Sequence, residues 1–377
     1  MDGKLEVVIA GGGVAGLEAA FALRELAGDR VAVTVLAPEG EFVYRPMSIR
    51  EPFRQVPPQR YALPTVVGDA GAELIQDSFR WLDAPNRVLH TSGGLTLGYD
   101  ALVLALGART RPHYKHALTL DDRRMVEQLA GLLQDIDRGI VRSVAALIPA
   151  RGIWPLPLYE LTLLIARHAR QHLASVQLTL VTPEDAPLAI FGGEVSEAVS
   201  ELLERSGIEV LTSASAEVPI PGVVSVRPAG SMLEVDRVIA LPELYGPSTP
   251  GVPKSARGGF ISVDPFCRVR GLQGVYAAGD ATDFPVKFGG VAASQADTAA
   301  ASIAAAAGAT VDARPFQPVI HGVLVGGDKP LYLSAHLLGS HGARSQASPA
   351  PTWRLPTKIA ARYLAPYLDA RDRAALR

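Results

Sequence analysis

Three glycines near the N-terminus have the spacing of a phosphate-binding turn. Gly11, Gly13 and Gly16 form a G-x-G-x-x-G motif in KLEVVIAGGGVAGLEAAFALREL. In such a motif the first glycine makes a tight turn, the second lets the backbone approach a pyrophosphate, and the third lets the helix pack closely on the strand. The free N–H groups at the start of the following helix, near Val14 and Ala15, would face the phosphate. The motif therefore predicts a dinucleotide site.

The residues on either side of the motif support this prediction. Leu5–Ala10 is an almost continuous apolar run, as expected for a buried parallel strand, and VAVTVLAPE follows the helix as a second strand. An acidic residue usually ends this second strand and holds the adenosine ribose. Ala37 occupies that position here, so Glu39, two residues further on, is the candidate for the ribose contact.

Two later strand-and-turn motifs indicate which dinucleotide is bound. YDALVLALGART contains a strand that ends at Gly107, where the chain crosses between domains, and GVYAAGDAT ends in a turn at Gly279 and Asp280. The Asp280 carboxylate can accept hydrogen bonds from the hydroxyls of a ribityl chain, and the next helix can direct its N-terminus at a flavin pyrimidine. Because NAD has no ribityl chain, this motif favours non-covalent FAD.

The three motifs, in this order, resemble the pyridine nucleotide–disulfide oxidoreductase superfamily over nearly the whole chain. EFVYRP (41–46), KFGGVAASQAD (287–297) and TKIAARYLAPYL near the C-terminus are similar to the branch with type II NADH dehydrogenases, sulfide:quinone reductases and flavocytochrome c sulfide dehydrogenases. The resemblance implies an extended FAD with its pyrophosphate at the three glycines. It also implies the following contacts: Arg45 and Pro46 near the isoalloxazine, the backbone of Phe79 near adenine, Gly107 at the crossover and Asp280 on the ribityl-phosphate arm.

The element order predicts an α/β chain with two three-layer, Rossmann-like domains, the second inserted in the first. The first comprises residues 1–115 and 254–320, the second 116–253, and a small α+β interface region 321–377. Within the second we expect helices at 120–138, 155–173 and 194–206 and strands at 143–148 and 176–181. The stretch VTVLAPEGE, which starts at Val33, has the same pattern as LTLVTPEDA, which starts at Leu178. This internal sequence similarity indicates a duplicated fold.

The second domain does not repeat the glycine-rich loop. Between Ile148 and the helix the chain reads PARGIW, and Pro155, expected at the first helical position, removes one N–H that would face a phosphate. One interpretation is that the domain keeps its fold and no longer binds NAD(P)H. A second is that Arg151 makes a charge-assisted phosphate contact instead. A third is that Trp154 and Tyr159 line a pocket for a different donor.

Cys267 is the single cysteine in the chain, which excludes a dithiol relay and paired sulfur-carrying cysteines. Cys267 is expected to be a buried packing thiol. With the cysteine relays excluded, we expect electrons to pass directly between the substrates and the flavin. Lys287 is the candidate cation beside the flavin pyrimidine, with a solvated loop lysine as the alternative. Gln295 lies in the helix where relatives place glutamines beside a quinone. His168 and His172 share a helix face, but two ligands without a third predict no metal site.

The composition restricts the partners. A formal net charge of -2 gives no reason to expect nucleic acid, and no apolar run reaches the length of a membrane span. The start of the chain shows no signal peptide, so a cytoplasmic protein is expected, with a peripheral membrane location as the alternative. Near the C-terminus an apolar helix face is predicted to pack against its own domain or a dimer mate rather than a bilayer. Its members are Ile359, Tyr363, Leu364, Tyr367 and Leu368.

Three functional hypotheses follow from these residues. The first is an FAD-dependent oxidoreductase that passes electrons between a small-molecule donor and a quinone or other small acceptor, without NAD(P)H in the standard site. The second is an NAD(P)H-dependent flavin reductase with an altered phosphate loop. The third is a flavin-binding redox sensor or scaffold without turnover. The sequence leaves the donor, the acceptor and the oligomeric state open.

Overall fold

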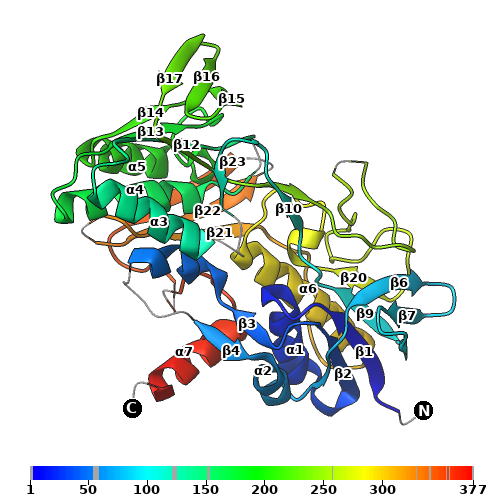
Figure 1. Ribbon diagram of the computed structural model, residues 1–377. Helices are drawn as coiled ribbons and strands as arrows, with labels where there is room; N and C mark the ends of the chain where they lie inside the picture. The colour runs from blue at the N-terminus through cyan, green and yellow to red at the C-terminus, as the bar shows by residue number, and fades with distance from the viewer. Residues whose placement is uncertain are drawn as a thin grey trace.

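A five-stranded parallel sheet forms the centre of the first domain (Figure 1). The computed structural model describes residues 3–53, 59–120, 125–150, 153–256, 258–327, 329–338, 341–353, 355 and 357–375. The sheet has the order β20-β9-β1-β2-β5. Its strands are β1 (Leu5–Ala10), β2 (Val31–Leu36), β5 (Glu73–Ile75), β9 (Ala101–Leu104) and β20 (Val275–Ala277). Because β20 joins this sheet after the chain has built a second one, the predicted insertion of one domain in the other is confirmed.

The sheet is covered on both faces. Helices α1 (Val14–Ala27) and α6 (Gly289–Ala306) pack on one face, and an antiparallel sheet of β6 (Phe79–Asp83), β7 (Val88–Thr91) and β8 (Thr96–Gly98) packs on the other. Successive side chains of a strand point to opposite faces. Val7 and Ile9 of β1 accordingly lie in the helix-side core, and Val8 and Ala10 lie in the other core. This alternation explains the continuous apolar run that the sequence shows.

The inserted domain repeats this plan. Its parallel sheet has the order β11-β18-β12-β13-β14. The strands are β11 (Leu118–Thr119), β12 (Ser143–Leu147), β13 (Gln177–Val181), β14 (Ile208–Leu211) and β18 (Arg237–Ala240). The helices are α3 (Met125–Asp137), α4 (Leu156–Gln171) and α5 (Gly193–Arg205). The order β18-β12-β13-β14 matches the order β9-β1-β2-β5 of the first sheet. The two similar sequence stretches therefore lie on the equivalent strands β2 and β13, which confirms the duplicated fold.

Smaller elements complete the two domains. An antiparallel sheet of β15 (Ser215–Ile220), β16 (Val223–Arg227) and β17 (Ser231–Glu234) belongs to the second domain, and β10 (Arg109–Arg111) pairs with β19 (Glu243–Tyr245). In the first domain, β3 (Glu41–Val43) pairs with β4 (Arg60–Ala62), and α2 (Leu63–Asp69) follows. The described residues also form the 3-10 helices η1 (Gly28–Arg30), η2 (Arg45–Phe53), η3 (Ala189–Phe191) and η4 (Gly279–Ala281).

The C-terminal region contains a sheet and a helix. Strands β21 (Val319–Leu324), β22 (Leu331–Leu338) and β23 (His341–Ser348) form an antiparallel sheet, and α7 (Leu364–Ala375) follows it. Ile320 and Leu333 of this sheet belong to the same core as Leu156 and Phe191 of the second domain. The C-terminal region therefore begins with a strand at Val319, two residues before the predicted boundary, and the sheet packs on the inserted domain.

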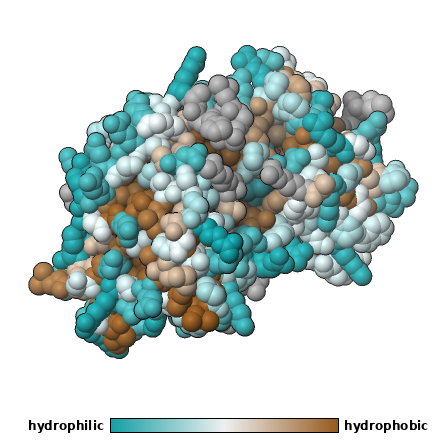
Figure 2. All heavy atoms as spheres, turned by 90° about the horizontal axis from the view of Figure 1, so that it is seen from above, coloured by the Kyte–Doolittle hydropathy of each residue, from teal (hydrophilic) through white to brown (hydrophobic). Residues whose placement is uncertain are grey.

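The apolar face predicted near the C-terminus packs against the first domain. Ile359, Leu364 and Leu368 are buried in the core that contains α1, and Tyr363 and Tyr367 are partly buried against it. Elsewhere, exposed large apolar side chains belong to separate elements, and Figure 2 shows apolar atoms in several places among hydrophilic ones. Among the described residues, no helix has the length and apolar character needed to cross a membrane.

Candidate dinucleotide site and the altered second loop

The three glycines of the first motif lie between β1 and α1 and have different roles. A Cβ on Gly11 would fall 2.2 Å from the Ala105 carbonyl oxygen, and one on Gly16 would fall 1.8 Å from the Gly11 carbonyl oxygen. Both positions therefore require glycine for close packing. A Cβ on exposed Gly13, the N-cap of α1, would meet nothing within 4 Å. The free space at Gly13 is where a pyrophosphate can approach the backbone, so the loop fits a dinucleotide.

The third motif lies directly against the first. A Cβ on Gly279, which has a φ of 77°, would be 3.2 Å from the Cβ atoms of both Ala15 and Ala292. This close approach holds the Gly279–Asp280 turn at the N-terminal end of α1. The fold thus joins the two motifs that the sequence separates by more than 250 positions, as an extended FAD requires.

Gln295 holds this turn in place. Its amide oxygen accepts a hydrogen bond from the Gly279 N–H at 2.8 Å and one from the Thr282 hydroxyl at 3.3 Å. The side chain belongs to the core, with 1% of the residue exposed. The prediction that Gln295 lines a substrate pocket is therefore wrong, because its amide is buried and bonded to the turn.

Charged side chains meet beside Asp280. Burial raises the pKa of the half-buried Asp280 carboxyl, and the positive charges of Lys287 and Arg45 act against that shift. Lys287 is buried, its ammonium lies 4.0 Å from the centre of the Phe260 ring, and it donates to the Thr282 carbonyl. Desolvation lowers the Lys287 pKa to about 8. The alternative that Lys287 is a solvated loop lysine is therefore wrong. The catalytic role of its buried ammonium stays a prediction.

The other predicted FAD contacts lie around the same edge of the sheet. Ala37 is fully buried at the end of β2, and Glu39 is exposed just beyond it. Pro46 is half-buried at the start of η2, and Gly107, with a φ of 68°, follows β9 and faces open space. Phe79 is the first residue of β6. The contacts of Glu39 with the ribose, of Pro46 with the isoalloxazine and of Phe79 with adenine stay predictions. The place of Gly107 at the FAD crossover also stays a prediction.

The N-terminus of α4, where a second phosphate loop would lie, offers few N–H groups. Pro155 is the N-cap rather than the first helical residue, which corrects the expected helix start, and Pro157 is the second helical residue. Neither proline has an N–H. The Leu158 N–H donates to the Pro155 carbonyl at 3.0 Å. The alternative based on Arg151 lies outside the described residues, as does Gly152.

Aromatic side chains fill the space beside this helix start. The half-buried Trp154 stacks on Phe288, the residue that precedes α6, with ring centroids 4.5 Å apart and an angle of 20°, and its ring is 5.5 Å from Phe191. Tyr159 is fully buried, and its hydroxyl donates to Glu184 at 2.9 Å. The prediction that Tyr159 lines a donor pocket is therefore wrong. Trp154 instead packs the inserted domain onto the start of α6.

The structure adds a buried ion pair that the sequence analysis missed. Glu160 of α4 accepts hydrogen bonds from the Lys358 ammonium, and the two side chains are 3% and 9% exposed. Burial raises the Glu160 pKa to about 6, although the charges of Lys358 and Arg50 oppose this. Burial also lowers the pKa of Lys358. A carboxylate in the otherwise apolar stretch PLPLYELTLLIA was the signal that could have identified Glu160.

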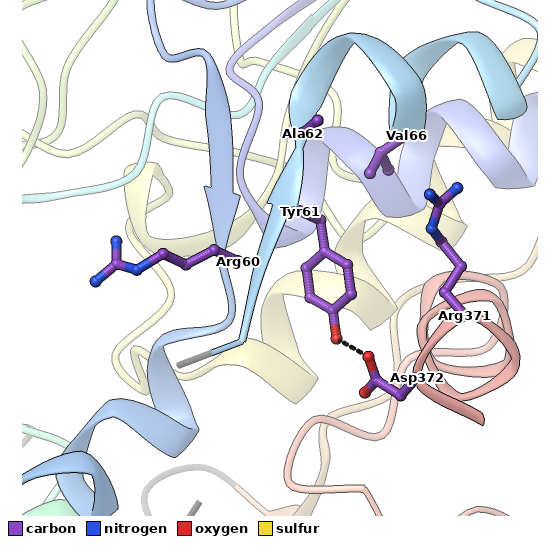
Figure 3. Close-up of a pocket in the computed structure, with 6 residues that line it drawn as sticks. All are labelled: Arg60, Tyr61, Ala62, Val66, Arg371 and Asp372. Carbon is purple, nitrogen blue, oxygen red and sulfur yellow. Dashed lines mark hydrogen bonds between the residues drawn. The ribbon is translucent and has the colours of Figure 1, made fainter. Parts of the chain in front are cut away.

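Lys358 and Arg50 also line a cavity of about 320 Å³ between η2, β21, β22 and α7. One part of its wall is apolar and includes Met47, Val323 and Leu368. The cavity extends towards a neighbouring one of about 270 Å³, which shares Tyr61 and Asp372 with it. Figure 3 shows the Tyr61 side chain directed from β4 towards α7, where its hydroxyl donates to Asp372 at 2.8 Å.

Cys267 has the packing role that the sequence predicted. It is 1% exposed, and burial raises the pKa of its thiol to about 12. A thiol with such a pKa stays protonated near neutral pH and is a poor nucleophile. Sulfur relay chemistry therefore has no cysteine to use in this chain.

Comparisons with known proteins agree with this architecture. The family described as pyridine nucleotide-disulphide oxidoreductase matches residues 5–134 and 160–308. The stretch between the two matched segments, residues 135–159, contains the altered loop. A NADH dehydrogenase-like protein of Mycobacterium tuberculosis is 26% identical over 289 residues, which are 73% of this chain and 72% of that protein.

Solved structures share the fold. A sulfide:quinone oxidoreductase from Aquifex aeolicus superposes with a TM-score of 0.79 at 16% identity, covering 99% of this chain and 91% of its own. An NAD-dependent persulfide reductase from A. fulgidus gives a TM-score of 0.65 at 19% identity, covering 88% and 64%. NDH2 from Plasmodium falciparum, solved with NADH, gives 0.61 at 16% identity, covering 74% and 65%.

The two duplicated parallel sheets, the joined glycine motifs and the family match over most of the chain lead to one conclusion. This chain belongs to the pyridine nucleotide-disulphide oxidoreductase family and is a flavin-dependent oxidoreductase.

Proposed function

We propose that this protein passes electrons between a small-molecule donor and a small acceptor such as a quinone, using FAD in the first domain and no NAD(P)H in the second. The N-terminus of α4 carries this proposal. A helix start binds a phosphate through free N–H groups. Pro155 and Pro157 have none, and the N–H of Leu158 is bonded to Pro155. At the start of α1, by contrast, Gly13, Val14 and Ala15 all carry an N–H, and Gly13 faces open space.

When bound, FAD supplies the transfer of a hydride or of single electrons. The residues of this chain bind and orient it. The N-terminus of α1 would hold the pyrophosphate, and the Asp280 carboxylate would accept hydrogen bonds from ribityl hydroxyls. The Lys287 ammonium adds positive charge beside Asp280 and would favour negative charge on a flavin ring bound next to it. Its position over Phe260 and its bond to the Thr282 carbonyl restrict the motion of the ammonium.

The 320 Å³ cavity is the proposed acceptor site. Ligand pockets of about this size are mainly apolar with a few polar groups that fix orientation. Met47, Val323 and Leu368 provide apolar contact for one ring, and the Lys358 ammonium can donate a hydrogen bond or a proton to an acceptor oxygen. Glu160, whose pKa of about 6 leaves it mainly ionised near neutral pH, accepts hydrogen bonds from Lys358 and holds the ammonium in its protonated, donating form.

A second candidate function is an NAD(P)H-dependent reductase with an altered loop. The resemblance to the mycobacterial NADH dehydrogenase-like protein supports this candidate, as does the NADH in the NDH2 structure. It requires the nicotinamide coenzyme to bind at α4 without the usual N–H groups, through side chains instead.

Anaerobic reduction of the FAD-loaded protein separates the two candidates. NADH, NADPH, sulfide and a quinol are each mixed with the protein, and bleaching of the flavin absorbance is followed by stopped flow. Our proposal expects slow or no bleaching by NADH and NADPH at sub-millimolar concentration, and rapid reoxidation of photoreduced protein by a soluble quinone. Rapid bleaching by NADH would establish the second candidate. Tight FAD binding without reoxidation by any acceptor would instead indicate a sensor or scaffold.

A further inference from the structure

The ends of α3 and α4 bring together three metal-ligating side chains outside the flavin site. His168 and His172 are four residues apart on α4 and at its C-cap, so both rings lie on one helix face. Asp137, the last residue of α3, faces both of them. Its two carboxylate oxygens lie 2.8 Å from His168 Nε2 and 3.3 Å from His172 Nδ1. The sequence alone predicts no metal site, because it shows only two ligands on one helix face, and the fold supplies the third.

The distances suit a single ion. One ligand atom from each residue lies within 4.8 Å of the other two, and the imidazole rings stack at 4.0 Å with an angle of 28°. Ligands of a tetrahedral zinc ion, at about 2.0–2.2 Å, are roughly 3.3–3.6 Å apart. Small side-chain rotations are therefore enough to bring two ring nitrogens and one carboxylate oxygen to a common centre.

The surroundings favour a cation. Both helices end at this point, and each helix C-terminus carries a partial negative charge of about half an electron. Phe53, at the end of η2, places its ring 6.0 Å from that of His168 and shields one side. The His168, Asp137 and His172 side chains are 14%, 32% and 49% exposed, so solvent can reach the ion and complete its coordination.

We propose that Asp137, His168 and His172 form a site for a divalent transition-metal ion of the zinc type, which ties the end of α3 to the end of α4. Two imidazoles and one carboxylate are ligands that zinc accepts and that calcium and magnesium, which prefer all-oxygen shells, do not favour. The open coordination positions belong to water. The site is separate from the flavin site and does not depend on the proposed function.

Cobalt(II) and zinc test this site in the full-length, FAD-loaded protein after treatment with a chelator. Cobalt(II) in a low-coordinate histidine site is expected to give a visible absorption band at wavelengths beyond the flavin bands, and zinc is expected to displace it. Zinc is also expected to raise the Tm, reversibly with chelator. The variant His172→Gln changes a half-exposed side chain and is expected to weaken zinc binding at least about tenfold, since even the loss of an outer-shell partner costs about that much.

His113 and Glu243 provide the matched control. His113 Nδ1 lies 2.6 Å from a Glu243 carboxylate oxygen, and the pair belongs to no three-ligand group among the described residues. His113→Gln is expected to leave zinc affinity unchanged. Absence of a cobalt band, or equal zinc affinity of His172→Gln and the unaltered chain, would show that Asp137 only pairs with the two imidazoles and would overturn the proposal.

Discussion

The indole of Trp154 stacks on the ring of Phe288 at 4.5 Å and thereby joins the altered loop of the inserted domain to the start of α6. Phe288 is the N-cap of α6, and the next residues, Gly289 and Gly290, begin that helix. Trp154 of the second domain therefore packs on the N-terminal end of α6. In our proposal this end of α6 points towards the flavin ring. The contact connects a change of loop sequence with the geometry of the flavin site.

Removal of the Trp154 indole is expected to reduce stability without creating an NADH-dependent enzyme. Trp154→Ala removes the contacts with Phe288 and Phe191, and a loss of roughly 1–3 kcal/mol is expected for this half-buried ring, below the 3–5 typical of full burial. Pro155 and Pro157 still lack N–H groups, so flavin bleaching by NADH stays slow. Trp154→Phe, which keeps an aromatic contact, is the control. Denaturant unfolding and stopped-flow absorbance measure the two effects, and fast bleaching in Trp154→Ala alone would contradict the role given to the prolines.

Two glycines of the first motif are expected to respond differently to substitution. Gly13→Val adds a side chain to open space, so the protein folds but loses most of its FAD, because the added atoms occupy the approach of the pyrophosphate. Gly16→Ala forces a methyl group against the Gly11 carbonyl and costs about 1–3 kcal/mol of folding stability. Flavin content after gel filtration and thermal unfolding measure these outcomes. Gly131→Ala, in the open interior of α3, is the control and is expected to be neutral or stabilising by about 0.5–1 kcal/mol.

The buried pair of Glu160 and Lys358 is expected to show strong coupling. Lys358→Met leaves the Glu160 carboxylate buried without its partner, and a loss of about 3–5 kcal/mol is typical of such a change. Glu160→Gln is expected to destabilise for the same reason, and the double variant should lose much less than the sum of the two. A double-mutant cycle by denaturant unfolding measures this, and simple additivity would be inconsistent with a direct ion pair. Reoxidation by quinone should slow in both single variants if the adjoining cavity is the acceptor site.

A carboxyl pair between α1 and α6 is expected to make stability depend on pH. Glu18 accepts hydrogen bonds from the N–H groups of Arg362, Tyr363 and Leu364 at the start of α7. Desolvation, and after it the negative charge of Glu18, raises the pKa of the half-buried Asp297 carboxyl to about 9. The folded protein keeps the Asp297 proton up to that pH, whereas the unfolded chain loses it near 3.8. The stabilising contribution of the protonated Asp297 is therefore complete below about pH 4 and decreases as the pH rises towards 9.

Asp297→Asn replaces the protonated acid with a neutral group of the same shape and tests this dependence. Between pH 5 and pH 8 the Tm of both proteins should fall. The fall in the variant should be smaller than the fall in the unaltered protein by at least about 2–4 °C. Glu18→Gln is the contrasting variant, since it removes the charge that accepts three N–H groups and should lower the Tm at both pH values. Equal Tm changes in Asp297→Asn and the unaltered chain would show that Asp297 does not retain its proton.

The amino-acid sequence by itself determined the features that depend on neighbouring residues. Two Rossmann-like domains could be predicted from the glycine spacing at Gly11–Gly16, the apolar run of β1 and the sequence similarity between β2 and β13. These patterns are informative because strand burial and tight turns are local requirements. The altered loop was also visible from the sequence, since Pro155 and Pro157 lack an N–H in any fold. The buried state of Cys267 was predicted correctly in the same way.

Only the tertiary structure decided which distant side chains meet. Glu160 and Lys358 are 198 positions apart, and Asp137 joins His168 and His172 only because α3 and α4 end at the same place, as Figure 1 shows by the two helices lying side by side. Gln295 and Tyr159 were assigned to pockets from their positions in the sequence, and the structure instead buries both in hydrogen bonds. Local patterns set the shape of each element, but the packing of elements sets which polar groups lose water and must find a partner.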